Sequence, residues 1–486
     1  MRVAMLHWAF PPTIGGVESH LALLGPELVR EGHQVSLLTG LDPTRSNNAS
    51  WAGASKGLAP AGFEARSDQG RGWPEKHSAG QRLGPAGAGG RSWPDGPPGP
   101  DGPPGPDGSP GPDGNQQLVE RLQWRGMDIW RSPLIDLNYL SSADIARRSA
   151  EIEELIEQFL DEVNPDIVHA HNFHYFSPTH AQALATLKKK KGFPLVLTAH
   201  NVWADATWEA LLSYIDIWDG VIAVSNYIKG ALIASGYPAE RITVIYHGID
   251  ATQFTPSEPG SDHFLPGLPP ELLAGRRVVF HPARMRLEKG SHLSVQALKS
   301  VIRQFPNVLL LLAGTEQAVD WEREHASEVR YVSSLIEELG LKDYVYVHFI
   351  PWDEMPRFYQ AAEICIYPSC FEEPFGLALL EAQAAGKPMI ASRAGGMPEI
   401  ITDGYNGLVI PKDDSQALAR AIEELLLHPD LARAMGQRGR KLVLERFTVA
   451  RMASETVEFY QRVLDWAPRA VSLARSETGF TEAGFT

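Results

Sequence analysis

Short apolar runs alternate with longer amphipathic stretches along most of the chain. The apolar runs are continuous instead of alternating with polar residues, which is typical of strands buried on both faces of a parallel sheet. In the first half we expect strands at residues 2–7, 35–38, 167–169, 195–198, 220–224 and 242–245. We expect helices between them at residues 17–31, 142–163, 177–190 and 226–235, with Gly25-Pro26 kinking or splitting the first. This pattern predicts a doubly wound α/β domain.

The pattern pauses over residues 255–275, which are rich in proline, glycine and serine, and then starts again. In the second half we expect strands at residues 277–281, 308–313, 345–349, 364–367, 388–391 and 407–410. Helices are expected at residues 290–303, 331–339, 377–385, 415–427 and 450–464. The sequence therefore predicts a second α/β domain of the same kind.

These patterns divide the chain into five predicted parts. We expect an N-terminal Rossmann-like domain (1–254), a linker (255–275), a C-terminal Rossmann-like domain (276–449), a helix that crosses back to the first domain (450–466) and a loose tail (467–486). Open α/β sheets bind ligands outside the carboxyl ends of their strands. Two such domains facing each other predict one ligand site in a cleft between them.

Composition sets one segment apart from this regular body. Of the 44 glycines and 37 prolines, 17 glycines and 13 prolines fall between residues 42 and 116, and from 94 to 114 glycine takes every third position. The repeat is compatible with a short collagen-like triple helix that would make the chain a trimeric scaffold protein. It is also compatible with an extended, disordered insertion in the N-terminal domain, which is the interpretation we favour.

Charge and cysteine content narrow the class of protein. The net charge of −15 argues against binding nucleic acid by counterion release. Two cysteines, Cys365 and Cys370, exclude a disulfide framework, and no apolar run is long enough to span a membrane. We expect a cytoplasmic monomer or dimer. The lysines at 188–191 could give peripheral contact with the inner face of a membrane, or could simply end a helix favourably.

Candidate anion-binding residues follow two predicted strands. Gly15 and Gly16 precede the first helix, where backbone amides can approach a ligand closely. Arg284 and Lys289 lie just before the helix expected at 290–303, so two cations and a helix N-terminus come together. This arrangement outlines a site for a diphosphate.

Histidines and glutamates supply further candidates. His200 follows a buried strand, as His169 and His171 end another, but the sequence near them offers no carboxylate or cysteine cluster, and we predict no metal. Glu373 lies in a Pro/Gly turn, and Glu381 lies on an otherwise apolar helical strip. A carboxylate there requires partners, because burying an unpaired charge is costly, and sugar or ribose hydroxyls would serve.

Glu373 and Glu381 form a Glu-x7-Glu motif, and the chain resembles the retaining, nucleotide-sugar-dependent glycosyltransferases of family 4, which have the GT-B fold. The likeness covers about residues 1–40 and 117–465 and rests on motifs in matching order and spacing. These are the Gly-Gly-Val-Glu start of the first helix, the Arg-x4-Lys pair of Arg284 and Lys289, and a nearly continuous block from 359 to 410.

The resemblance implies a role for each candidate. Arg284 and Lys289 would bind the donor diphosphate, with backbone contact from Gly15 and Gly16. Glu381 would bind the ribose, and His200 would contact the donor sugar. Glu373 would hold the sugar hydroxyls together with the amides of Phe375, Gly376 and Leu377. The family needs no metal and no cofactor.

Three matters stay open at the level of sequence. Many relatives have asparagine where this chain has His247, so we assign that residue no role. The donor base is uridine or guanosine, and the acceptor is an unidentified small molecule, glycan or lipid-linked hydroxyl. GT-B sugar-nucleotide epimerases share the fold and the donor, so epimerisation is the alternative to sugar transfer.

Overall fold

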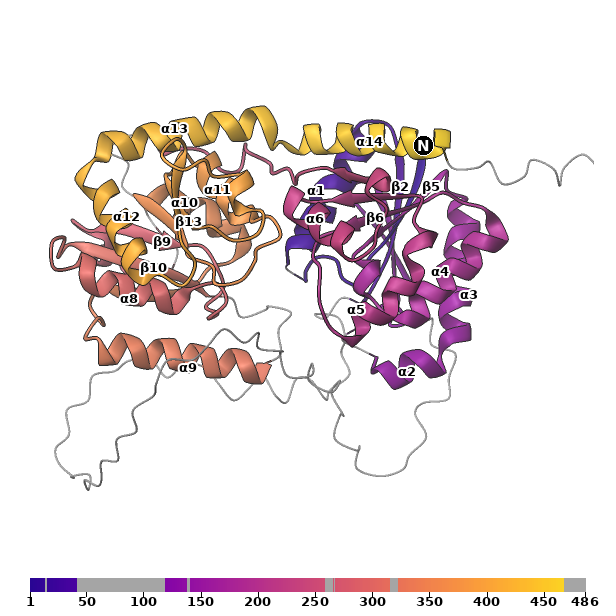
Figure 1. The fold of residues 1–486 in the computed structure, drawn as a ribbon, viewed down its shortest axis with the longest axis horizontal. Helices are drawn as coiled ribbons and strands as arrows, with labels where there is room; N and C mark the ends of the chain where they lie inside the picture. Colours follow the sequence, from indigo (N-terminus) through magenta and orange to yellow (C-terminus); the bar gives the residue numbers. More distant parts are fainter. Residues whose placement is uncertain are drawn as a thin grey trace, which may run out of the picture.

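The computed structural model describes residues 1–13, 15–41, 119–137, 140–257, 265, 267–314 and 322–466. The Gly/Pro-rich insertion expected at 42–116 and the tail expected at 467–486 lie outside these residues, as does most of the sequence from 258 to 266. The collagen-like and the disordered interpretations of the insertion therefore both stay predictions. Figure 1 shows the described chain as two α/β units side by side.

The first unit contains an eight-stranded sheet in the order β3-β4-β2-β1-β5-β6-β7-β8. All neighbouring strands are parallel except β3 and β4 at one edge. The strands are β1 (Arg2–Leu6), β2 (Gln34–Thr39), β3 (Glu120–Trp124), β4 (Met127–Arg131), β5 (Ile167–His171), β6 (Leu195–Ala199), β7 (Gly220–Ala223) and β8 (Ile242–Val244).

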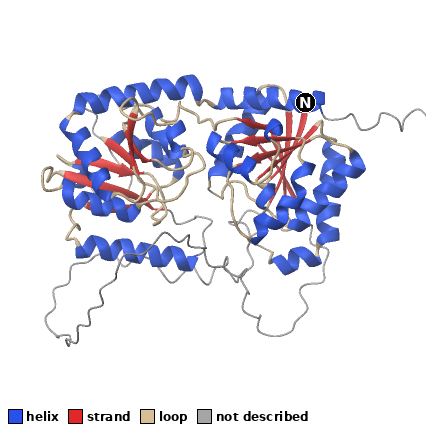
Figure 2. Cartoon of the chain, viewed as in Figure 1, coloured by secondary structure: helices blue, strands red, loops and turns tan. Residues whose placement is uncertain are grey.

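Successive residues of these strands enter two different cores, as expected for a sheet covered on both faces. Val3 and Met5 of β1 pack with one set of helices, whereas Ala4 and Leu6 pack with another. The helices of this unit are α1 (Gly16–Arg30), α2 (Ser142–Arg147), α3 (Ser149–Val163), α4 (Pro178–Lys191), α5 (Ala206–Leu211) and α6 (Asn226–Ala234). Figure 2 shows helices on both sides of the strands.

The second unit contains a six-stranded, fully parallel sheet in the order β11-β10-β9-β12-β13-β14. The strands are β9 (Arg277–His281), β10 (Val308–Gly314), β11 (Val345–Phe349), β12 (Ile364–Tyr367), β13 (Met389–Ser392) and β14 (Gly407–Ile410). The helices are α7 (Pro270–Leu273), α8 (Ser291–Val301), α9 (Glu322–Glu338), α10 (Met355–Ala361), α11 (Leu377–Ala384), α12 (Ser415–Leu427) and α13 (Pro429–Arg446).

The last helix, α14 (Val449–Trp466), packs on the first unit, beside α1 (Figure 1). Tyr460 places its hydroxyl 2.6 Å from Nδ1 of His169. Gly220 of β7 lets the helix approach, because a Cβ there would lie 2.6 Å from Phe459 and 2.7 Å from Val463. Helices α13 and α14 thus connect the two units along one side of the molecule.

The structure corrects several expected helices and strands. Pro26 does not split α1, which continues from Gly16 to Arg30, and Gly25 allows close packing because a Cβ there would collide with Met127 of β4. The helix expected at 142–163 is two helices that meet at Arg148. The hairpin of β3 and β4 and the long helix α13 were not anticipated from the sequence pattern.

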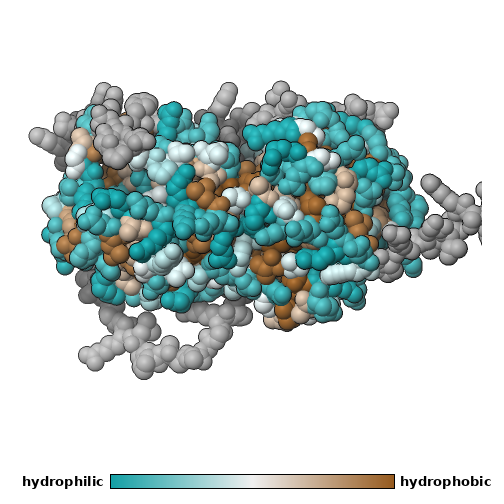
Figure 3. Space-filling model, turned by 90° about the horizontal axis from the view of Figure 1, so that it is seen from above, coloured by the Kyte–Doolittle hydropathy of each residue, from teal (hydrophilic) through white to brown (hydrophobic). Residues whose placement is uncertain are grey.

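No helix among the described residues is long and apolar enough to cross a membrane. The face shown in Figure 3 is mostly hydrophilic, with hydrophobic residues in scattered patches. Three lysines at the end of α4, Lys188, Lys190 and Lys191, are paired with acidic residues. Lys188 lies 2.7 Å from Asp219, and Lys190 and Lys191 each lie 2.7 Å from Glu157. These contacts favour a helix end stabilised by local ion pairs.

Candidate active site

The loops that follow two neighbouring strands of the second sheet, β9 and β12, contain a buried lysine–glutamate pair. Nζ of Lys289, in the loop after β9, donates to both carboxylate oxygens of Glu373 at 3.1 and 2.9 Å. The Tyr367 hydroxyl at the end of β12 lies 3.3 Å from the same carboxylate. Both charged side chains are about seven-eighths buried, at 13% and 12% exposure. The pair lies where open α/β sheets bind ligands, beyond the carboxyl ends of the strands.

Lys289 keeps its positive charge in this setting. Burial acts to lower its pKa, but the neighbouring Tyr367 and Glu373 raise the pKa above its ordinary value on balance. Burial and Glu373 raise the pKa of Tyr367. Arg284, which is half-buried in the same loop, partly opposes that rise together with Lys289. The loop therefore presents two cations, although Arg286 beside them is engaged by Glu328 at 2.8 Å.

Two glycine turns fix the backbone of Glu373. Gly395 has φ +54, and a Cβ there would collide with the carbonyl oxygen of Glu373. The amide of Gly396 donates to that same oxygen at 2.8 Å. The next turn begins α11 at Gly376, whose φ of +104 is one that residues with a side chain rarely adopt. The position of the glutamate is thus set by backbone contacts that require glycine.

Glu381 of α11 has the partner that its apolar surroundings require. The Tyr359 hydroxyl donates to Oε2 of Glu381 at 2.7 Å, and Oε1 takes no part in this bond. Burial raises the pKa of Glu381, and the tyrosine partly opposes that shift. The carboxylate therefore depends on hydrogen-bond donors for its charge.

In the first unit, Gly15 and Gly16 open α1, as the sequence suggested. A Cβ on Gly15 would collide with the carboxylate of Glu18, whereas Gly16 has open space where a Cβ would be. Oε1 of Glu18 is 3.1 Å from Nε2 of buried His7. Gly16 can therefore be approached closely by a ligand, while at Gly15 the Glu18 side chain occupies the space that a Cβ would take.

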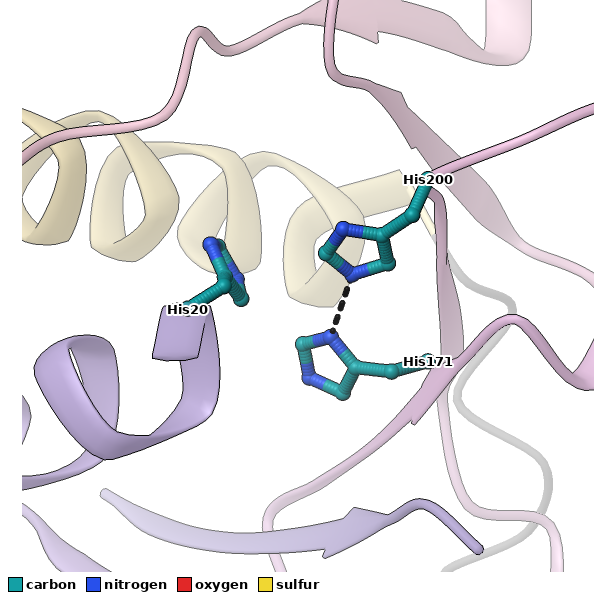
Figure 4. A group of neighbouring side chains, drawn as sticks. All are labelled: His20, His171 and His200. Atoms are coloured by element: carbon teal, nitrogen blue, oxygen red, sulfur yellow. Dashed lines mark hydrogen bonds between the residues drawn. The ribbon is translucent and has the colours of Figure 1, made fainter. Parts of the chain in front are cut away.

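His200 belongs to a cluster of buried histidines. It follows β6, His171 ends the adjacent strand β5, and His20 comes from α1, as Figure 4 shows. Nε2 of His200 lies 3.2 Å from Nδ1 of His171, and the His200 ring stacks on His247 at 5.2 Å between centroids. Burial, together with the neighbouring histidines, holds the pKa of His200 well below its ordinary value, so the ring is neutral at pH 7.

His247 connects this cluster with the second unit. Its ring lies 5.1 Å from that of Phe375, the buried residue two positions after Glu373. The Ser225 hydroxyl also donates to the carbonyl of Pro374 at 2.6 Å. The turn that carries Glu373 therefore packs directly against the first unit, on the side of the histidines.

The structure also separates candidates that the sequence had treated alike. Both ring nitrogens of His169 are within hydrogen-bond distance of hydroxyls, those of Tyr460 and Thr198 at 2.6 and 2.7 Å, which indicates a structural histidine. Sequence reasoning did not identify His20, because nothing in its helix marks it as a partner of the distant His171.

A carboxylate clasp between the two units was likewise not anticipated. Glu399 of the second unit accepts hydrogen bonds from the amides of Asn226 and Tyr227, which begin α6, at 2.8 and 2.9 Å. The side chain of Asn226 and the hydroxyl of Tyr246 donate to it as well, at 2.9 and 3.0 Å. An acidic residue at the start of a helix is favoured by the orphan amides and by the helix dipole.

Comparisons with known proteins agree with this architecture. The family model "Glycosyl transferases group 1" matches residues 270–442, and "Glycosyltransferase Family 4" matches 108–253. The α-maltose-1-phosphate synthase of Mycolicibacterium smegmatis is 31% identical over 61% of this chain and 79% of its own length. The D-inositol 3-phosphate glycosyltransferase of Corynebacterium urealyticum is 32% identical over 50% of this chain and 56% of its own length.

Solved structures show the same fold along nearly the whole chain. Sucrose-phosphate synthase from Thermosynechococcus elongatus has a TM-score of 0.67 at 21% identity, covering 95% of this chain and 99% of its own. Anabaena Alr3699/HepE, solved in complex with UDP and glucose, has a TM-score of 0.64 at 19% identity, covering 95% and 100%. The chain therefore belongs to the group 1, family 4 glycosyltransferases and has their GT-B fold.

Proposed function

We propose that this glycosyltransferase moves a sugar from a uridine or guanosine diphosphate sugar to a hydroxyl acceptor, with retention of the anomeric configuration and without a metal. The observation that carries the proposal is the buried Lys289–Glu373 pair, in which glycine turns fix the backbone of the glutamate. Such a pair provides a cation for the leaving diphosphate and a carboxylate for sugar hydroxyls at neighbouring positions.

Lys289 and Arg284 stabilise the leaving group in this proposal. When the donor binds, Lys289 exchanges part of its contact with Glu373 for a phosphate oxygen. Fixed cations that face charge developing in the transition state lower the barrier strongly, because they need no reorganisation. Two such cations supply the charge that a metal provides in other transferases. Gly16 adds a backbone approach from the first unit, because the space that a side chain would take there is open.

The two glutamates hold the donor by its hydroxyl groups. Glu373, which gives up part of its contact with Lys289, accepts from the sugar hydroxyls next to the amides of Phe375, Gly376 and Leu377, at the turn that leads into α11. Glu381 accepts from the ribose through the oxygen that Tyr359 leaves unused. Each hydroxyl replaces water at a carboxylate whose charge would otherwise be costly in these surroundings.

His200 contacts the donor sugar as a neutral imidazole. Its Nδ1 is buried without a hydrogen-bond partner among the described residues, so its hydrogen-bonding capacity is unused and can serve a sugar hydroxyl. Retention follows if the acceptor attacks the face from which the diphosphate departs. The leaving phosphate oxygen then takes the acceptor proton, the glycosidic bond to phosphate breaks, and the bond to the acceptor oxygen forms.

Relatives support this proposal without naming the acceptor. The HepE structures contain UDP, UDP with glucose, or UDP-glucose, which favours a uridine donor as the first to be tried. Of the two curated relatives named above, one is a synthase and the other a glycosyltransferase by name, and neither is named as an epimerase. The cytoplasmic location and the monomeric or dimeric state stay predictions from the sequence.

A transfer assay tests the proposal directly. Purified protein is incubated in chelator with uridine and guanosine diphosphate sugars, with and without a panel of hydroxyl acceptors. The proposal expects nucleoside diphosphate release that depends on both substrates, and a product whose anomeric proton shows the donor's configuration by NMR. Epimerised donor in the absence of acceptor, an inverted product, or a rate abolished by chelator would contradict it.

A further inference from the structure

Three histidines of the cluster place metal-ligating atoms close together. One ring nitrogen each from His20, His171 and His200 lies within 4.8 Å of the others, and the described residues contain this one such group (Figure 4). The separation of 3.2 Å between Nδ1 of His171 and Nε2 of His200 is close to the roughly 3.3 Å between two nitrogens bound tetrahedrally at about 2.0–2.1 Å from zinc. The rings are thus spaced as ligands would be.

All three histidines are buried, and one of them has an unpaired nitrogen that could bind an ion. The three residues are only 6%, 0% and 4% exposed. Nδ1 of His20 has a partner in His247, whereas its Nε2 is buried without a hydrogen-bond partner among the described residues. Buried polar atoms in native proteins normally have partners, and an ion held together with the facing nitrogens of His171 and His200 would supply one.

The chemistry of the cluster selects one class of ion. Nδ1 of His20 lies 2.9 Å from Nδ1 of His247, the outer contact that metal-binding histidines commonly make through their second nitrogen. Imidazole ligands suit zinc and similar transition metals, whereas magnesium and calcium prefer oxygen.

We propose that His20, His171 and His200 bind one zinc-type divalent ion. Three histidines leave a fourth, open position on such an ion. The binding of the ion does not rest on the proposed function, because the ion takes Nε2 of His200 whereas the donor sugar is assigned to Nδ1.

Metal binding is tested without any substrate. Metal-free protein is titrated with Co²⁺, followed by its visible absorption, and the zinc-loaded protein is examined by X-ray absorption. The proposal expects one equivalent bound in a four-coordinate, nitrogen-rich site. Absence of Co²⁺ binding, or a zinc shell dominated by oxygen, would overturn it. This measurement uses the unaltered protein and does not depend on a variant folding.

Matched variants then locate the site. His20→Gln and His171→Gln keep a polar side chain and should each weaken Co²⁺ binding by at least about tenfold, since even second-shell changes cost 10–100-fold. His428→Gln serves as the control, because His428 is exposed between α12 and α13 and should bind Co²⁺ like the unaltered protein. Near-ultraviolet circular dichroism checks the fold. Equal affinity in all folded proteins would place the ion elsewhere and refute the assignment.

Discussion

The clasp formed by Glu399 gives a quantitative prediction about how the two units stay together. Four donors from the first unit converge on one carboxylate of the second, at 2.8–3.0 Å. Each hydrogen bond contributes about 0.5–1.5 kcal/mol net, and the site is partly exposed to water, which favours the lower half of that range. Glu399→Ala should therefore reduce the free energy of unfolding by about 3 kcal/mol.

Thermal unfolding followed by calorimetry measures this loss. For a domain of about 200 residues, 1 kcal/mol corresponds to about 2–4 °C, so the Tm of Glu399→Ala should fall by more than about 5 °C. Tyr246→Phe removes one of the four donors and should cost about 1 kcal/mol in the original protein but almost nothing in Glu399→Ala. Glu445→Ala is the control, because Glu445 is exposed and its nearest lysine is 3.8 Å away. A Tm change under about 1 °C in Glu399→Ala would refute the clasp.

Three further predictions concern the donor site and the buried histidines. Glu381→Gln should weaken UDP binding by about tenfold or more, measured by calorimetric titration, because an amide replaces a charge-assisted acceptor of the ribose; unchanged affinity would remove Glu381 from the donor site. Gly395→Ala should abolish most activity while Gly404→Ala, also at positive φ (+71) but with no atom within 4 Å of a Cβ, should keep it; similar rates would contradict the proposed close packing. Burial lowers the pKa of His180 to about 4 and of His281 to about 3. Their contribution to the free energy of unfolding is therefore complete above about pH 6.5, the ordinary pKa of histidine in the unfolded chain. It is lost as the pH falls from there toward the lowered pKa values, by about 1.4 kcal/mol per pH unit for each histidine. Denaturant unfolding at pH 7.5 and 5.5 measures this, and equal or greater stability at pH 5.5 would show the reasoning to be wrong.

Much of the fold could be predicted because its central strands are buried on both faces and are therefore continuously apolar. The strands expected at 277–281, 345–349, 364–367 and 407–410 have the bounds that the structure gives. The edge strand β3 was missed because its residues alternate between half-buried and exposed and are mostly polar. The sequence does not show which edge of a sheet will be paired or covered.

Helix α13 was missed for a different reason. Its glycines suggest a helix breaker, but a Cβ at Gly436 would collide with the backbone of Gly386, and one at Gly439 would lie 3.0 Å from Gln383. These glycines serve close packing of α13 on the region of α11. A residue's effect on local propensity is visible in the sequence, whereas its tertiary contact is not.

The candidate site divides in the same way. That Lys289 and Glu373 lie in loops after strands could be predicted, because both are in short motifs next to predicted strand ends, while their roles in donor binding stay predictions. The pairing of His20 and His247 could not be predicted, because they are 227 positions apart and meet only when the sheet is assembled. The burial of Glu381 likewise required a hydrogen-bond partner, but the sequence could not show that this partner is Tyr359. The need for a partner follows from the buried charge, whereas the identity of the partner follows from the fold.

The affinity of nucleoside diphosphate for two lysine variants tests the central claim most directly. Lys289→Ala removes the cation paired with Glu373, and Lys412→Ala removes the one paired with the adjacent Glu372. Isothermal titration with UDP and GDP, in chelator, should show at least about tenfold weaker binding in Lys289→Ala, the loss of roughly 1.4 kcal/mol or more expected for a charge-assisted phosphate contact. Lys412→Ala should bind like the unaltered protein. Equal affinity in both variants, or a loss confined to Lys412→Ala, would contradict the proposed donor site.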